Sequence, residues 1–477
     1  MSTTIPRVRF APSPTGIMHI GNSRTALLNF LFAQQKNGVF VLRIEDTDPS
    51  RNFDPGAKII IEDLAWLSLR FDEGPQAGGI YAPYFQSERH HIYQEKLEEL
   101  IQKNLVYRCY CTEELLEKKR DRQKTLKQPP RYDRTCLKLS EQEIDEYAKN
   151  NTPFVWRFKL DSDQIIEITD LSRGIITFDL KHFSDFPLTR SDGSFTFMFS
   201  NFVDDVTMKI THVFRGEDHQ SNTAGQAAMY LASGAPLPIF WHMPMLCNIT
   251  GKKLSKRDFG FSLHDLRDAG YLPQAINNYL AIIGGSYTQE IMDMDELVQA
   301  IDFDHMSAGG QIKYDVEKLR WVNHEWIKRL APHELEIATR PFLQAVYPEV
   351  GAFNDKKLAA LLQEIKTDLH TLKDAVTALA FYFTAPEITK ALVEQTLDAT
   401  HSKAIAHLLA DRLDTIEDVE GLKAATKQAG IPMKQLFWTM RLALTGQING
   451  PGIHELITML GVAESRNRLK AFINLFF

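Results

Sequence analysis

The feature that most constrains the fold is a strand–helix–strand pattern within the first 44 residues. Residues 8–12 (VRFAP) form a short apolar segment, after which Pro12, Pro14 and Gly16 favour a loop. Residues 21–36 (GNSRTALLNFLFAQQK) have the length and apolar content of a buried helix. Residues 39–44 (VFVLRI) are a nearly unbroken apolar run, typical of a central strand in a parallel sheet. The pattern therefore predicts a βαβ unit and an α/β fold.

The rest of the chain suggests several domains, since 477 residues are too many for one hydrophobic core. A charged helix, Pro129-Pro130 and short strands over residues 109–190 indicate an insertion into the sheet domain. Residues 207–215 (TMKITHVFR) return to a buried strand, and from about residue 262 the chain is mostly helical. We predict an α/β domain at 1–108 and 191–260, an insertion at 109–190, a helical region at 261–320, and a helical half at 321–477 that divides near 375–385.

Composition and charge exclude some classes of protein. No apolar run reaches the roughly 18 residues needed to span a membrane, and residues 1–6 do not resemble a signal peptide, so a cytoplasmic protein is expected. The net charge of -7 argues against a general polyanion-binding coat but not against a local basic surface. Residues 118–134 hold eight lysines and arginines, for which a solvated helix face is the simpler interpretation from the run alone.

Polar residues follow three of the predicted strands at their carboxyl ends. They are Arg9 to Ser13, Glu45 to Asp48, and Arg215 to Asp218. Ligands of open parallel sheets bind beyond these ends, so the three groups should converge. A carboxylate can bind an ammonium group and arginines can bind carboxylates, which together suit an amino acid.

Two loops have the chemistry of phosphate-binding segments. Residues 12–22 open onto a helix N-terminus, where His19 can donate a hydrogen bond and Gly21 permits close approach of a nucleotide. Residues 251–257 place Lys252, Lys253, Lys256 and Arg257 in one glycine-led loop that could clamp a polyphosphate. Taken alone, the first loop is better explained by a structural histidine, and the second could equally be a nucleic-acid patch or a solvated turn.

Taken together, the motifs resemble those of glutamyl-tRNA synthetases. His19-Ile20-Gly21-Asn22 and Lys253-Leu254-Ser255-Lys256-Arg257 are similar to the HIGH and KMSKS signatures of class I aminoacyl-tRNA synthetases. RFAPSPTG, LRIEDTD (42–48), YFQSER (84–89), VDD (203–205) and THVFRGEDH (211–219) narrow the likeness to the glutamyl family. It extends through YLPQAINNYL (271–280) and KLRWVN (318–323) to PGIHELITMLG (451–461).

The resemblance implies a Rossmann-like catalytic domain, an inserted α+β domain that holds the tRNA acceptor end, and an all-α half that reads the anticodon. It implies ATP-dependent activation of L-glutamate, with Mg²⁺, and transfer to the terminal adenosine of tRNA-Glu by a monomer. The implied HIGH region comprises Pro12, Ser13, Pro14, Thr15, Gly16, Ile17, Met18, His19, Ile20, Gly21 and Asn22. The implied KMSKS region comprises Lys253, Leu254, Ser255, Lys256 and Arg257.

Individual roles follow from the same resemblance. The residues implied to bind glutamate are Arg9, Ser13, Glu45, Phe197, Asn201, Arg215 and His219. Those implied to bind ATP are His19, Gly21, Asn22, Lys253, Ser255 and Lys256, and catalysis is assigned to His19, Gly21, Lys253 and Lys256. Arg24 and Asp46 are polar residues nearby for which a structural salt bridge is as good an interpretation.

The sequence departs from the family pattern at three places. Asn22 replaces the second histidine of HIGH, and Phe197 stands where relatives usually carry a tyrosine. Cys109, Cys111 and Cys136 resemble the zinc site of some members, but Lys138 takes the position of the usual fourth ligand. Since lysine is protonated at neutral pH, the sequence favours a metal-free loop, with zinc on three thiolates and an unidentified ligand as the alternative.

Other activities on the same fold stay open. The chain could be non-discriminating and charge tRNA-Gln as well as tRNA-Glu, or be specific for tRNA-Gln. A glutaminyl-tRNA synthetase is disfavoured because its anticodon module is β-rich. An inactive tRNA-binding paralogue is disfavoured because His19, Glu45 and Lys256 are present. A nucleotidyltransferase for a small molecule would not need the insertion and the helical half.

Overall fold

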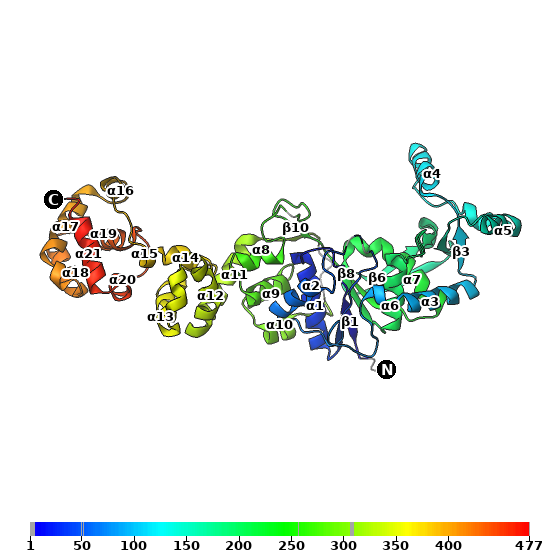
Figure 1. The fold of residues 1–477 in the computed structure, drawn as a ribbon, viewed down its shortest axis with the longest axis horizontal. Coiled ribbons are helices and arrows are strands. Elements are labelled where there is room, and N and C mark those ends of the chain that lie inside the picture. Colours follow the sequence, from blue (N-terminus) through cyan, green and yellow to red (C-terminus); the bar gives the residue numbers. More distant parts are fainter. Residues whose placement is uncertain (1–4, 49, 51, 256, 306–309, 477) are drawn as a thin grey trace. The chain divides into compact units, whose positions relative to one another are not determined.

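The computed structural model describes residues 5–48, 50, 52–255, 257–305 and 310–476 (Figure 1). The chain forms two compact units, one of Met1–Asp265 with Asn277–Val316 and one of Leu266–Ile276 with Glu317–Phe477. Within the described residues, no helix is both long and apolar enough to cross a membrane. The first unit is α/β and the second helical, as predicted.

The predicted βαβ unit is present at the N-terminus. β1 (Arg7–Phe10) and β2 (Val39–Leu42) are parallel in the register Arg7↔Val39 to Phe10↔Leu42, and α1 (Ile20–Gln35) connects them. α1 packs on β1, β2 and β8 and also contacts α10 (Met294–Ala300), so most of its side chains are buried. This two-sided packing explains why the sequence of α1 has little amphipathic character.

β1 lies beside β8 (His212–Gly216), and the N–H of Thr211, the residue before β8, donates to Arg7 O at 3.0 Å. β8 pairs in parallel with β9 (Ile239–Met243), and β9 pairs in parallel with β5 (Ile165–Asp170) through Phe240 and Asp170. β6 (Gly174–Asp179) closes this edge as the antiparallel partner of β5. The ends of β1, β2 and β8 therefore meet at one edge of the sheet.

The inserted segment contributes to two sheets. β3 (Val106–Cys109), β4 (Val155–Phe158) and β7 (Phe186–Pro187) form a separate antiparallel sheet in the order β3-β4-β7. The β5–β6 hairpin instead extends the sheet that carries β8 and β9. α4 (Glu113–Thr125) and α5 (Glu141–Lys149) lie at the edge of the first unit and bury none of their residues (Figure 1). The insertion is thus joined to the sheet domain through its hairpin.

The first unit also contains α2 (Lys58–Trp66), α3 (His90–Gln102), α6 (Phe197–Thr207), α7 (Gln220–Ser233), β10 (Leu246–Cys247) and β11 (Ile312–Lys313). The residues of α8 (Leu263–Asp268) and α9 (Pro273–Ile282) are divided between the two units. The strand predicted at 207–215 begins only at His212, because α6 continues to Thr207. Thr207 is held in the helix by its hydroxyl, which accepts a 2.8 Å hydrogen bond from Arg89.

The second unit is built from helices. They are α11 (Val316–Arg329), α12 (Pro332–Val346), α13 (Asp355–Ile365), α14 (Asp374–Ala378), α15 (Ala380–Phe383), α16 (Lys390–Thr396), α17 (Ala399–Asp411), α18 (Val419–Gln428), α19 (Met433–Thr445), α20 (Ile453–Leu460) and α21 (Val462–Ile473). A continuous apolar core runs from Phe381 to Ile473 and holds α15 to α21 together. The predicted all-helical half is confirmed.

Candidate active site

Three cavities adjoin at the carboxyl ends of β1, β2 and β8. The largest, 350 Å³, lies at the start of α1 and is lined by His19, Gly21, Lys253 and Phe261 among others. A second of 290 Å³ contains Arg9, Glu45, Asn201 and Arg215. A third of 260 Å³ borders Asp46, Asp48 and Arg190. The second cavity shares its walls with both others, and His219 lines all three. The site can therefore hold a small anionic molecule beside a larger ligand.

His19 is the N-cap of α1 and has a defined tautomer. Its Nδ1 accepts a 3.2 Å hydrogen bond from the Asn22 N–H, which leaves the proton on Nε2. Burial lowers the pKa of His19, and nearby Lys253 lowers it further. The ring also stacks on Phe261 with 5.2 Å between centroids. A neutral imidazole is therefore fixed with one N–H available to donate to a phosphate oxygen.

The structure adds a second reason for glycine at position 21 to the close nucleotide approach that the sequence predicts. A Cβ at this position would lie 3.1 Å from both Cε1 and Nδ1 of His19. Such contacts are tighter than ordinary van der Waals packing. A side chain at position 21 would therefore press against the His19 ring.

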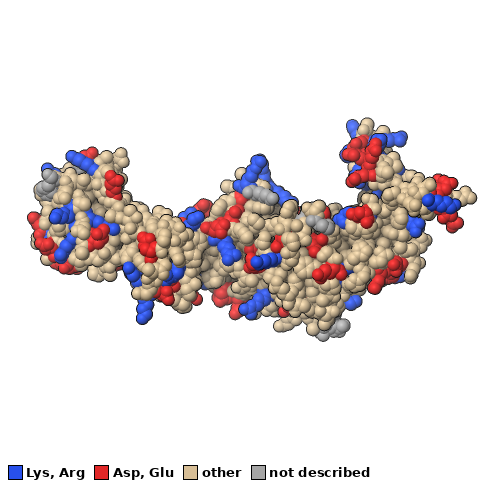
Figure 2. Space-filling model, viewed as in Figure 1, with Lys and Arg blue, Asp and Glu red and all other residues tan. Residues whose placement is uncertain are grey.

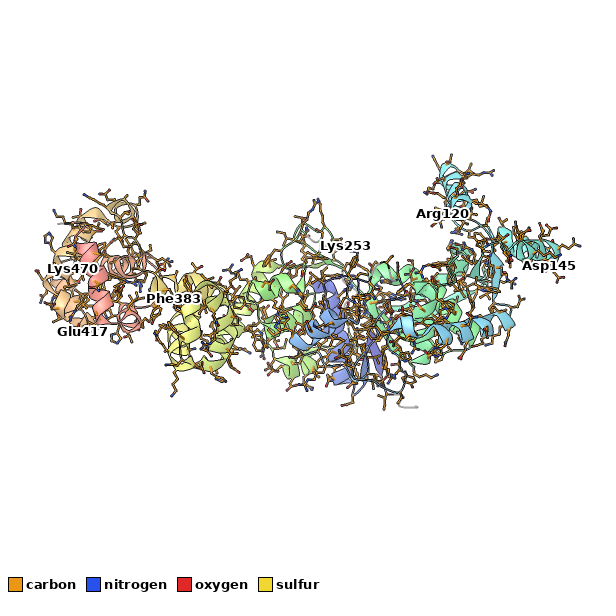
Figure 3. All side chains as sticks on the ribbon, in the orientation of Figure 1. Arg120, Asp145, Lys253, Phe383, Glu417 and Lys470 are labelled. Atoms are coloured by element: carbon orange, nitrogen blue, oxygen red, sulfur yellow. The ribbon has the colours of Figure 1, made fainter. Side chains whose placement is uncertain are left out.

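The lysine-rich loop lies next to the His19 cavity and is tied to the first loop. The Ile20 N–H donates to Phe261 O at 2.8 Å, and the Leu263 N–H donates to Met18 O at 3.0 Å. Lys253 lies 3.7 Å from Asp218, with two-thirds of its side chain exposed. Figure 3 shows Lys253 on the loop beyond β10, where lysine and arginine side chains gather in Figure 2. The exposed cations of this loop, Lys253 among them, could bind the phosphates of a polyphosphate.

Two other predicted residues of this loop have different outcomes. Lys256 lies outside the described residues. The Ser255 hydroxyl donates to Asp258 at 2.9 Å, and Asp258 also accepts from the Ser255 N–H. Ser255 therefore shapes the loop and is absent from the walls of the cavities described.

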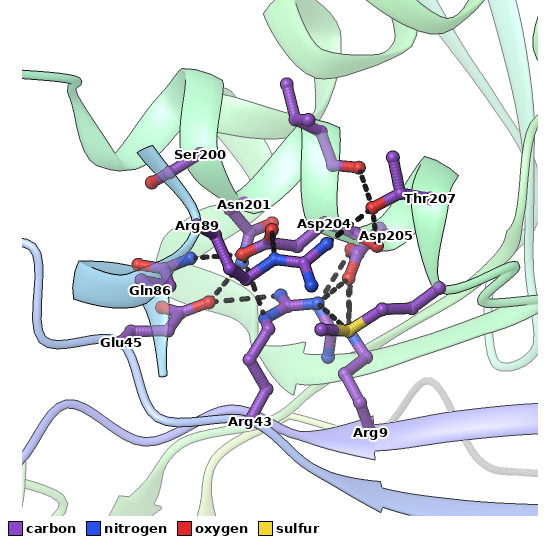
Figure 4. A network of polar contacts seen from close by, with 12 residues as sticks. Arg9, Arg43, Glu45, Gln86, Arg89, Ser200, Asn201, Asp204, Asp205 and Thr207 are labelled. Carbon is purple, nitrogen blue, oxygen red and sulfur yellow. Dashed lines mark hydrogen bonds and ion pairs between the residues drawn. The ribbon is translucent and has the colours of Figure 1, made fainter. Parts of the chain in front are cut away.

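Beneath the second cavity lies a network of buried ion pairs (Figure 4). Asp205 accepts from Arg9 at 3.1 Å and from Arg43 at 2.6 Å. Arg43 also donates to Glu45 at 3.1 Å, and the Asn201 amide donates to Glu45 at 2.6 Å. Burial raises the pKa of Glu45, against the opposing effect of Arg43. An incoming ammonium group would add a second cation and favour the ionised carboxylate.

A second buried carboxylate anchors the same helix. Asp204 of α6 accepts hydrogen bonds from Arg89 at 2.6 Å, from Gln86 at 2.8 Å and from Tyr93 at 3.0 Å. Asp204 and Asp205 thus attach α6, which carries Phe197 and Asn201, to the segments around β2 and α3. The role of these two aspartates was not assigned from the sequence, although both belong to the VDD motif.

Arg215 differs from Arg9 in having no carboxylate partner. It is 7% exposed and forms no ion pair with any described residue. Its terminal nitrogens donate to Gln226 at 2.7 Å and to Thr223 at 2.6 Å, and its Nε has no partner within the described part of the chain. Burial lowers the pKa of Arg215 to about 10, so it stays cationic at neutral pH. A buried guanidinium in a cavity wall that forms no direct ion pair is a binding group for an anion.

The remaining predicted residues of the amino acid site line the same space. Ser13 is exposed at the mouth of the second and third cavities. Phe197 is half-buried and packs against His219 with 5.6 Å between ring centroids. Burial lowers the pKa of His219, and Arg215 lowers it further.

Arg24 and Asp46, by contrast, do not pair with each other. Arg24 donates to the carbonyls of Leu280 and Ile283, and Asp46 accepts from the amide and hydroxyl of Ser87. Neither forms a salt bridge with any residue that the structure describes.

The three cysteines of the insertion form a compact cluster. The sulfur atoms of Cys109, Cys111 and Cys136 lie within 4.8 Å of one another. The hydroxyl of Tyr132 lies 3.3 Å from Cys109 Sγ and 3.9 Å from Cys111 Sγ. Lys138, where a fourth ligand was sought in the sequence, is exposed. The Tyr132 hydroxyl therefore lies at the cluster. Tyr132 precedes Cys136 by four residues, whereas the family pattern directs attention to a position after Cys136.

The basic run at 118–134 is partly neutralised. Lys118 pairs with Glu114, Lys119 with Asp133, and Lys124 with Asp121, all within 3.1 Å. Figure 2 shows acidic and basic side chains mixed over α4, and Figure 3 labels Arg120 on this helix. The run is a mixed charged surface rather than an unbroken basic patch.

Comparisons with known proteins cover nearly the whole chain. Residues 6–321 match the family described as tRNA synthetases class I (E and Q), catalytic domain, and residues 325–473 match an anticodon binding domain. The chain is 36% identical over 480 residues to a glutamate–tRNA ligase of Carboxydothermus hydrogenoformans, covering 98% of this chain and 100% of the relative. It is 35% identical to the corresponding ligase of Bacillus subtilis, covering 97% and 99%.

A solved structure supports the same likeness. The crystal structure of a glutamate tRNA ligase from Elizabethkingia meningosepticum, in complex with its amino acid, superposes with a TM-score of 0.89 at 31% identity. The match covers 99% of this chain and 100% of that chain.

Proposed function

The chain belongs to the class I glutamyl-tRNA synthetases, and on this premise we propose that it activates L-glutamate with ATP and esterifies it to the 3′-terminal adenosine of tRNA-Glu. The observation that carries the proposal is the pairing of two opposite binding groups in one cavity wall. Glu45 offers a buried carboxylate for an ammonium group, and Arg215 offers a buried guanidinium that forms no ion pair with a described carboxylate.

We propose that Arg215 binds a carboxylate of glutamate and that Glu45 and Asn201 hold its ammonium end. Arg9 already shares Asp205 with Arg43, so its charge is largely compensated and it contributes through its remaining N–H groups. Ser13, Phe197 and His219 complete the walls. Phe197 cannot donate the hydrogen bond that a tyrosine would, which should weaken glutamate binding rather than abolish it.

We propose that ATP·Mg²⁺ occupies the 350 Å³ cavity at the start of α1. The neutral His19 would donate to a phosphate through Nε2, and Lys253 and Lys256 would stabilise charge on the leaving pyrophosphate. The reaction needs no protein nucleophile, because the ionised α-carboxylate of glutamate attacks the α-phosphate and expels pyrophosphate. The shared wall of the two cavities supports that approach.

We propose that the insertion binds the acceptor end of tRNA and the helical unit its anticodon. Support in the insertion comes from a 570 Å³ cavity in which Arg108 lies 5.0 Å over Phe154 and 5.4 Å from Trp156. Aromatic and guanidinium planes of this kind stack on unpaired bases. The match of residues 325–473 to an anticodon binding domain supports the second assignment. We further propose that the enzyme acts as a monomer in the cytoplasm.

The deciding experiment is charging of separate tRNA-Glu and tRNA-Gln transcripts with radiolabelled glutamate, ATP and Mg²⁺. Charging of tRNA-Glu alone is expected and would establish a discriminating enzyme. Charging of both, or of tRNA-Gln alone, would replace it with a non-discriminating or specialised activity. Failure to charge either transcript would refute the catalytic proposal.

Zinc binding by the cysteine cluster is a separate proposal. Cys109, Cys111 and Cys136 supply three of the four ligands of a structural zinc site, and the Tyr132 hydroxyl lies close enough to be the fourth, although burial raises the pKa of Tyr132 and so disfavours the phenolate that would bind a metal. When bound, the ion would cross-link β3 to the segment before α5. We expect metal analysis of the purified protein to find one zinc per chain, and Cys136→Ser to lose it. Absence of zinc from protein purified without chelators would show that packing alone holds the loop.

A further inference from the structure

A chain of hydrogen bonds runs through the protein interior with Arg215 at its centre. On one side Arg215 donates to Thr223, Thr223 contacts His242 Nε2 at 2.7 Å, and His242 Nδ1 contacts Asp170 at 2.8 Å. Thr223, His242 and Asp170, the three residues of this relay, come from α7, β9 and β5 and are at most 1% exposed. The chain therefore connects a wall of the active site to the hairpin of the insertion.

The direction of the hydrogen bonds on this side follows from Asp170, which is ionised and can only accept, since hydrogen bonds from His242 and Ser172 outweigh burial and hold its pKa at about 2. His242 therefore carries its proton on Nδ1 and donates it to Asp170, which leaves Nε2 as an acceptor. The Thr223 hydroxyl, 2.7 Å away, donates to this Nε2 and accepts from Arg215 on its oxygen. Burial lowers the pKa of His242, in keeping with this neutral form.

On the other side of Arg215, the hydrogen bonds also have defined directions. Gln226 accepts from Arg215 through its carbonyl oxygen and donates to Asn201 at 3.0 Å, and Asn201 donates to Glu45. The two chains end at two carboxylates, Glu45 and Asp170. Asp170 is saturated, since it also accepts from the His242 and Ser172 backbone amides. Both terminal nitrogens of Arg215 are thus held by neutral oxygen atoms.

We propose that Thr223 and His242, anchored by Asp170, are positioning residues for substrate recognition: they fix the Arg215 guanidinium while leaving its charge for the glutamate carboxylate. A directly bound carboxylate would also fix an arginine, as Asp205 fixes Arg9, but it would compensate the charge that the substrate must meet. The inference rests on the proposed function, because it takes glutamate as the anion that Arg215 binds.

The test compares Thr223→Val, Thr223→Ser, His242→Gln and the control His212→Gln. Valine keeps the shape of threonine and removes the hydroxyl, whereas serine restores it. His212 is a histidine on β8, three residues before Arg215, that lines none of the cavities of the site. The KM values for glutamate and for ATP are measured by tRNA-dependent pyrophosphate exchange, with thermal denaturation as a check of folding.

Thr223→Val is expected to raise the KM for glutamate by roughly 10- to 100-fold, the range for losing a hydrogen bond to a charged group. The KM for ATP should stay within about twofold, Thr223→Ser should recover most of the loss, and His242→Gln should resemble Thr223→Val. The control should match the wild type. Equal KM values for glutamate in folded Thr223→Val and wild type, or parallel losses for glutamate and ATP, would overturn the proposal. An inactive wild type would refute the proposed function instead.

Discussion

Asp205 joins two arginines of the active-site floor, and its substitution by asparagine should be costly. Arg9 and Arg43 both donate to this carboxylate, and neither guanidinium is more than 4% exposed at its side chain. Asparagine keeps the shape but removes the charge, and one end of its amide is a donor. With the amide oxygen in the Oδ1 position, both arginines keep that acceptor but Arg9 Nη2 faces an N–H donor; with the amide turned round, Arg43 loses its acceptor.

The size of the effect follows from what is left behind. Arg43 keeps Glu45 at 3.1 Å and Asp204 at 3.6 Å, so it stays partly compensated. Arg9 loses the carboxylate with which it pairs and keeps only neutral acceptors, the amide oxygen and the Phe214 carbonyl at 3.3 Å. Removing one partner of a buried ion pair costs about 3–5 kcal/mol, which is a large part of the roughly 5–15 kcal/mol that stabilise a domain. We expect the free energy of unfolding of the first unit to fall by about 3–5 kcal/mol.

The assay is urea-induced unfolding combined with hydrogen exchange of the peptide that contains α6. Asp54→Asn is the matched control, because Asp54 is buried but accepts from the backbone amides of Ile59 and Ile60, which are neutral. It should cost only about 1 kcal/mol. The double variant Arg43→Met/Asp205→Asn should lose less than the sum of its single variants. Equal losses for Asp205→Asn and Asp54→Asn would refute the account of the network given above.

Three further substitutions have defined outcomes. Phe197→Tyr should lower the KM for glutamate roughly two- to tenfold in pyrophosphate exchange, since it adds one neutral hydrogen bond donor; an unchanged KM would mean that the hydroxyl reaches no acceptor. Gly21→Ala should raise the KM for ATP without lowering the melting temperature, because the new Cβ would press on the His19 ring at 3.1 Å while alanine suits a helix better than glycine; a lowered melting temperature with normal ATP binding would contradict this. Burial lowers the pKa of His212 to about 4, so the unfolded chain binds more protons between pH 6.5 and 4 and stability falls as the pH drops through that window. His212→Gln should remove on the order of 2 kcal/mol of that pH dependence in urea titrations at the two pH values, and identical pH profiles would count against it.

The sequence predicted the frame of the site because strand ends are local signals. The apolar run at 39–44 and the proline-rich loop at 12–16 placed β1, β2 and α1 correctly, within a few residues. Once the strands are parallel, the polar residues after each must converge, and they do. By contrast, the start of β8 was set too early, because α6 is extended by contacts from Arg89 that no local pattern reveals.

Partnerships across the chain were beyond a linear reading. Tyr132 reaches the cysteine cluster from an irregular segment, whereas the sequence directed attention to Lys138. The alternating pattern of residues 165–170 (IIEITD) is typical of a half-buried strand and coincides with β5. Its pairing with β9 is what brings Asp170 to His242. Thr223 ends a run of polar residues at the start of α7, and Gln226 lies among small residues; neither pattern predicts a contact with Arg215.

The two arginines of the glutamate cavity illustrate why these distant partners matter for function. Both are implied to bind glutamate by the same family resemblance, through two different motifs, and the sequence does not rank one above the other. The structure distinguishes them by what holds each in place. Arg9 is fixed by an anion and Arg215 by neutral oxygen atoms, so their capacity to attract a second anion differs although their side chains are identical. Specificity for a carboxylate substrate should therefore depend more on the neutral partners of Arg215 than on the number of cations in the site.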